Sequence, residues 1–122
     1  MIIIGDEFVP YEKIEKIASI NDIKNSTANS TLLFNYSIES MHYCSQNSLA
    51  YALKVQSLKE AIYANALHAK YIICESIVSS EIQKCAENYM FDAKIIQIIE
   101  SNDEFESVAS KQIDGVIYKN IL

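Results

Sequence analysis

Leu49-Ala-Tyr-Ala-Leu-Lys-Val-Gln-Ser-Leu-Lys-Glu60 passes from an apolar stretch into a serine that is followed, three residues later, by an acid. A serine at a helix N-cap accepts a hydrogen bond from a backbone N–H of the first turn. The side chain three positions on can bond back to the cap. The stretch therefore predicts a strand that leads directly into a helix.

The same unit recurs along the chain. It is found at Ser19-Ile-Asn-Asp22, Ser80-Glu-Ile-Gln83 and Ser101-Asn-Asp-Glu104, and more loosely at Ser37-Ile-Glu-Ser40. Strands that alternate with helices about every 20 residues are typical of a parallel sheet with crossover helices. We therefore predict an α/β fold with a mostly parallel sheet of about five strands. The apolar strand candidates are residues 32–36, 49–55, 71–74, 95–99 and 116–118.

Apolar residues at helical spacing predict which helix faces pack on this sheet. The clearest stripe consists of Ile82, Cys85, Ala86, Tyr89 and Met90, and a second consists of Leu58, Ala61, Ile62 and Ala66.

The length of 122 residues and an apolar content of 50% predict a single domain over residues 1–122. Within it, residues 1–10 carry Gly5-Asp6 between two apolar triplets, which predicts an N-terminal hairpin or an edge strand.

Composition argues against several classes of partner. The formal net charge is −6 and all ten basic residues are lysines, whereas nucleic-acid binding depends on cations that neutralise phosphates. No apolar run has the length of a membrane span. Three cysteines without a disulfide framework fit a reducing compartment. We expect a cytoplasmic protein that binds neither nucleic acid nor membrane.

Polar residues follow the predicted strands at their carboxyl ends, where parallel sheets bind ligands. Lys54, Glu75 and Glu100 are the candidate catalytic residues, because a desolvated lysine beside a carboxylate can act as a base or form an imine. The candidate ligand-binding residues are Asn35, Ser76, Lys119 and Asn120. The competing interpretation is a solvated sheet edge with loose ion pairs.

Other chemistry has less support. Cys74 stands at a strand end, but a nucleophilic cysteine needs a base, and only His42 and His68 are available. A buried structural cysteine is the more usual interpretation. There is no metal-ligand spacing and no glycine-rich phosphate loop, so no cofactor is predicted.

Two segments resemble the βα units of (βα)8-barrel enzymes. Residues 56–75 resemble a helix that packs back onto the following strand, and Ile113-Asp-Gly-Val-Ile-Tyr-Lys-Asn120 resembles a late barrel strand. His68 stands where those barrels usually have glycine, and Lys119-Asn120 replaces their phosphate-binding Gly-Ser. The resemblance thus implies the scaffold, and the phosphate site does not carry over.

Two architectures follow. The preferred one is a three-layer open sheet with helices on both faces, and the alternative is a half-barrel whose inner face is covered by a second copy. We expect a homodimer in either case, because an uncovered sheet face is a liability in water.

The leading functional hypothesis is a self-associating module that binds a protein or a small ligand without catalysis. The alternative is a small lyase or isomerase that acts on a carbonyl compound, with Lys54 as the base or imine-forming residue and Glu75 or Glu100 moving the proton.

Overall fold

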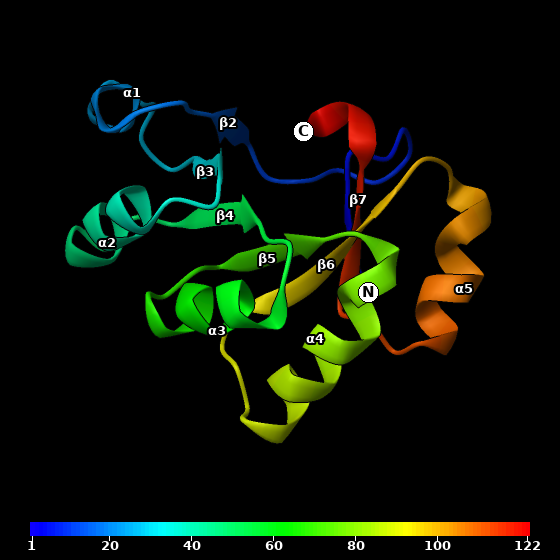
Figure 1. Cartoon of the computed structure of the whole chain (residues 1–122). Helices are drawn as coiled ribbons and strands as arrows, with labels where there is room; N and C mark the ends of the chain where they lie inside the picture. Colours follow the sequence, from blue (N-terminus) through cyan, green and yellow to red (C-terminus); the bar gives the residue numbers. More distant parts are fainter.

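The computed structural model describes residues 1–122 and contains one seven-stranded sheet in which every pairing is parallel (Figure 1). The strand order is β1-β7-β6-β5-β4-β3-β2. The strands are β1 (Ile2–Ile4), β2 (Ile14–Lys16), β3 (Thr31–Asn35), β4 (Tyr51–Lys54), β5 (Tyr71–Cys74), β6 (Lys94–Ile99) and β7 (Gly115–Tyr118).

The predicted parallel α/β sheet is confirmed, with seven strands where about five were expected. The two additional strands, β1 and β2, have three residues each and form the two edges of the sheet. β1 makes Ile2–Ile4 an edge strand that pairs in parallel with β7, so no N-terminal hairpin forms.

Most of the helices begin at the predicted serines. The helices are α1 (Ile20–Lys24), α2 (Ile38–Gln46), α3 (Leu58–Ala66), α4 (Ser76–Asn88) and α5 (Phe105–Ser110), with short 3-10 turns η1 (Asn102–Glu104) and η2 (Lys119–Ile121). Ser19, Ser37 and Ser57 each accept from the backbone N–H three residues on. Ser101 and Glu104 form a reciprocal capping box at η1.

The predicted helix start at Ser80 is wrong. α4 begins at Ser76, directly after β5, with Glu75 at its N-cap position, so Ser80 lies inside the helix. α4 also ends at Asn88, before the last two residues of the predicted stripe. Tyr89 and Met90 are therefore exposed, at 77% and 85%, whereas Ile82 and Ala86 are buried as expected.

The helices all lie on one face of the sheet, which makes the molecule a half-barrel and not the preferred three-layer open sheet. From β2 to β7, each strand lies beside the next one in the sequence. Right-handed crossovers that always step in the same direction place their helices on the same side. The larger apolar cluster accordingly contains residues from α1 to α5, and the smaller one contains strand residues alone.

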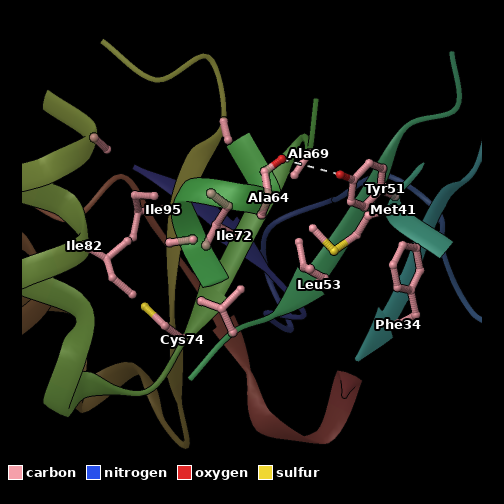
Figure 2. Close-up of a cluster of buried hydrophobic side chains, with 14 of the residues drawn as sticks. Phe34, Met41, Tyr51, Leu53, Ala64, Ala69, Ile72, Cys74, Ile82 and Ile95 are labelled. Atoms are coloured by element: carbon pink, nitrogen blue, oxygen red, sulfur yellow. Dashed lines mark hydrogen bonds between the residues drawn. The ribbon is translucent and has the colours of Figure 1, made fainter. Parts of the chain in front are cut away.

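The larger cluster fills the space between the sheet and the helices. Figure 2 shows its centre, where Met41 of α2, Ala64 of α3 and Ile82 of α4 pack with outward-facing strand residues. The buried hydroxyl of Tyr51 donates to the main-chain oxygen of Leu67 at 2.7 Å, which ties β4 to the end of α3.

The smaller cluster lies on the concave face. Its members are at most 7% exposed: Ile4, Leu33, Ala52, Tyr71, Ile73, Ile96, Ile98 and Ile117. Ile4 comes from one edge strand, and Ile14 of the other edge strand packs against the same cluster. The sheet therefore curls until side chains from its two edges share one interior, and this face is buried within a single chain.

Residues 5–13, the connector, run from the carboxyl end of β1 to the amino end of β2 across the open side of the half-barrel (Figure 1). At the start of the connector, the Asp6 carboxylate accepts a hydrogen bond from the Tyr118 hydroxyl at 2.6 Å. At the end of the connector, the Glu12 carboxylate accepts hydrogen bonds from the Lys70 ammonium, at 2.6 Å, and from the hydroxyls of Thr31 and Tyr71. Glu12 thus closes the amino end of the interior.

The Glu12 contacts predict acid-sensitive stability. Partial burial disfavours the charged carboxylate, but the hydrogen bonds from Lys70, Thr31 and Tyr71 outweigh it and hold the pKa of Glu12 below its ordinary value. A carboxylate whose pKa is lower in the folded state than in the unfolded state stabilises the fold at pH values above its ordinary pKa. This stabilisation is lost as the pH falls through the pKa of the folded state.

We expect Glu12→Gln to cost about 1 to 3 kcal/mol in the free energy of unfolding at neutral pH. The difference from the unmodified protein should shrink below about pH 4, as measured by urea denaturation across pH. Glu7→Gln, on the exposed part of the connector, is the matched control. A Glu12→Gln penalty that does not change with pH would contradict this account.

Candidate functional site at the carboxyl ends of the strands

Polar side chains lie at the carboxyl ends of the strands, on the same face of the sheet as the concave cluster. Leu33, Ala52 and Ile98 face the concave cluster, and two positions further on stand Asn35, Lys54 and Glu100. Successive side chains of a strand point to opposite faces. The carboxyl end of the half-barrel, here called the mouth, is therefore polar above an apolar floor.

The predicted pair of Lys54 and Glu75 comes together at the mouth. The Lys54 ammonium lies 3.3 Å from a Glu75 carboxylate oxygen, with the two side chains 35% and 53% exposed. Lys54 ends β4 and Glu75 follows β5, the neighbouring strand. Lys54 is thus half-buried and held by a carboxylate.

A small cavity lies beside this pair. It has a volume of about 150 Å³ and is lined by Lys16, Ile17, Leu33, Phe34, Asn35, Lys54 and Leu122. Its polar groups come from the ends of β2, β3 and β4, and its apolar lining includes Leu33 and Leu122, which pack in the concave cluster. The Phe34 ring lies on the helix side of the sheet, stacked on Tyr51. Two ammonium groups and one amide side chain thus converge on a space with apolar walls.

Of the seven cavity residues, only Asn35 and Lys54 were predicted as site residues, and the contact between Lys16 and Leu122 was missed. Lys16 ends the short edge strand β2, and its ammonium donates to the main-chain oxygen of Leu122 at 2.9 Å. The alternation in Ile14-Glu15-Lys16-Ile17 was the available signal for β2. The apolar character of Ile121-Leu122 is compatible with covering a sheet edge, but no local pattern identifies β2 as that edge, because the contact joins residues 106 positions apart.

The remaining predicted residues lie elsewhere on the mouth. Glu100, Lys119 and Asn120 surround a separate, open depression together with Tyr118. The Lys119 ammonium lies 3.7 Å from Glu100, and both side chains are more than two-thirds exposed, so this pair is a weak surface contact. Ser76 is the exposed first residue of α4.

Cys74 and His68 are not at the mouth. Cys74 is fully buried among the residues that face the helices (Figure 2). Burial, with a smaller contribution from Glu75, raises the pKa of its thiol to about 12 against the opposing effect of Lys111, so the thiol is protonated at neutral pH. His68 pairs instead with Ser45, at 2.7 Å from Nδ1 to the hydroxyl.

The structure contains neither a metal-binding cluster nor a membrane-spanning helix. No three side chains among histidine, cysteine, aspartate and glutamate are grouped so that they could hold a metal ion. None of the helices combines the length and apolar character needed to cross a membrane. In comparisons with known proteins, neither a family model nor a curated protein matches this chain.

Proposed function

We propose that the protein is a non-catalytic binding module that takes a small anionic molecule at the mouth of its half-barrel. The observation that carries the proposal is the cavity into which Lys16, Lys54 and Asn35 converge above an apolar floor. A few polar groups placed around an apolar concavity are the usual composition of a small-molecule site. Its position at the carboxyl ends of parallel strands is where such sheets bind ligands.

The charges at the cavity favour an anion. Lys16 and Lys54 carry two positive charges there, and Glu75 beside Lys54 carries one negative charge. Two lysine ammonium groups at one cavity favour an anionic ligand over a cationic one. The small volume, about 150 Å³, suits a molecule of few atoms.

A titration followed by NMR tests this proposal, with propionate, phosphate and propylamine as the probes. We expect the two anions to shift the amide signals of Asn35 and Lys54, and propylamine to leave them unchanged. Lys16→Met and Lys54→Met should each weaken anion binding about tenfold or more, because each removes a charge-assisted contact.

Lys59→Met is the matched control, since Lys59 is an exposed lysine on α3 that does not line the cavity. Equal binding of the amine and the anions would overturn the proposal. So would a loss of affinity in Lys59→Met as large as that in the two mouth variants.

Self-association is part of the same proposal, through the outer surface and not the concave face. Ile62 and Tyr63 of α3 and Tyr89 after α4 are large side chains that are 47% to 77% exposed, and exposed apolar patches are typical of interaction surfaces. Sedimentation equilibrium over a wide concentration range should give a dimer mass that Tyr89→Ser lowers. A monomer mass at every concentration would contradict this part.

The alternative function is a lyase or isomerase step on a carbonyl compound, which the 3.3 Å Lys54–Glu75 contact favours. Glu75 would accept a proton from the Lys54 ammonium. The amine would then attack the carbonyl carbon, and an imine would form with loss of one water.

Borohydride trapping tests the alternative. Pyruvate with cyanoborohydride should add mass at Lys54, and Glu75→Gln should slow the reaction about tenfold or more. Labelling of Lys54 no faster than the exposed Lys59 would mean ordinary surface reactivity and would rule out the catalytic role.

A further inference from the structure

A second depression lies at the amino end of the sheet, opposite the mouth. It has a volume of about 480 Å³ and is formed where α2 and α3 end and where β4 and β5 begin. Its lining includes the polar side chains of Ser45, His68 and Lys70 and the apolar residues Leu49 and Ala50. A hydroxyl, an imidazole and an ammonium group thus share one open space.

Ser45 and His68 are in direct contact at this depression. The Ser45 hydroxyl oxygen lies 2.7 Å from His68 Nδ1, and the structure gives this hydroxyl no other hydrogen-bond partner. A serine oxygen becomes a nucleophile when a neighbouring base takes its proton, which requires the two groups to be within hydrogen-bond reach. The pair therefore has the geometry of an activated serine.

The bonding of Ser45 differs from that of other serines in the chain. Four serine hydroxyls each donate to a main-chain oxygen three residues earlier: those of Ser26, Ser30, Ser79 and Ser110. A main-chain oxygen accepts a hydrogen bond and leaves the proton on the serine, whereas a neutral imidazole can take the proton. Ser45 alone is bonded to a histidine ring.

The backbone holds both partners in place. Ser45 lies in the last turn of α2. His68 follows α3 with a positive φ of 68°, and the N–H groups of His68 and Ala69 donate to main-chain oxygens of that helix. Glycine adopts a positive φ without strain, so the backbone at this position does not require a side chain. The imidazole that is present here is bonded to Ser45.

Lys70 adds a positive charge to the same depression. Its ammonium donates to Glu12 at 2.6 Å, and two of its three N–H groups remain for other acceptors. When a serine oxygen adds to an acyl group, the carbonyl oxygen of that group becomes negatively charged, and a nearby cation stabilises this charge. The apolar residues Leu49 and Ala50 suit the hydrocarbon part of a small acyl group.

We propose that Ser45 is a covalent acylation site, which accepts a small acyl group from an activated ester. His68 Nδ1 takes the hydroxyl proton while the serine oxygen forms a bond to the acyl carbon. The bond from that carbon to the leaving oxygen then breaks, and the leaving group takes the proton from His68. One acyl group remains on each chain as a serine ester, so this is a modification that goes beyond the binding function proposed for the mouth.

Acetylation by p-nitrophenyl acetate tests this inference, with mass spectrometry of the intact protein and of its peptides as the measurement. We expect one acetyl group per chain, on Ser45, before any lysine is labelled. Ser45→Ala should remove this label. His68→Asn should slow the labelling about a hundredfold or more, because it removes the base. Asparagine tolerates a positive φ, so the backbone at position 68 is retained.

Ser110→Ala and His42→Asn are the matched control variants. Ser110 is an exposed serine in the last turn of α5, and its hydroxyl donates to a main-chain oxygen. His42 is an exposed histidine of α2 that does not line the depression. Both variants should be acetylated on Ser45 at the rate of the unmodified protein. Thermal unfolding of all four variants shows that they are folded.

Three results would overturn the inference. One is acetylation of lysines or of the terminal amine without acetylation of Ser45. Another is a stable acetyl group on His68 in place of Ser45. The third is labelling of Ser45 in His68→Asn at the unmodified rate. Each result is read at Ser45 and His68, so none of them bears on whether an anion binds at the mouth.

Discussion

The constraint on which the structure depends is the uniform direction of its crossovers. Each strand from β3 to β7 lies beside its predecessor in the sequence, so right-handed connections put every helix on one face. The other face of an all-parallel sheet is still apolar and must be buried. Here the sheet meets that demand by curling, so that Ile4 and Ile14 of the two edge strands pack on one interior.

The two ends of this interior are closed differently. At the amino end, Glu12 takes hydrogen bonds from Thr31, Lys70 and Tyr71 and fastens the connector. At the carboxyl end, lysines and acids surround the mouth, and aliphatic residues from the C-terminal turn lie over the apolar floor. The amino end is closed by these hydrogen bonds, whereas the carboxyl end leaves a small cavity beside Lys16 and Lys54.

Much of the fold could be predicted from local sequence signals. The serine caps at Ser19, Ser37 and Ser57 mark real helix starts, and the unbroken apolar runs mark the central strands. The edge strands β1 and β2 were harder, because three residues carry too little pattern. The choice between an open sheet and a half-barrel depends on which side each helix takes, and periodicity within one helix does not contain that information.

The site was predictable only in part, for the same reason. The alternation along single strands placed Lys54 and Glu75 at one edge, where they are in contact. It also placed Glu100, Lys119 and Asn120 there, but the width of the sheet separates them into another depression. The Lys16–Leu122 contact spans 106 positions of sequence, so it follows from the curl of the whole sheet and from no local motif.

The central claim is that one chain buries its own concave face, with the two sides of the half-barrel meeting through Lys16 and Leu122. An isotope-filtered NOE experiment on ligand-free protein, with labelled and unlabelled chains mixed, tests it most directly. We predict NOEs between the Lys16 side chain and the Leu122 methyl groups within the labelled chain. NOEs only between labelled and unlabelled chains, or none at all, would contradict a half-barrel that closes by itself.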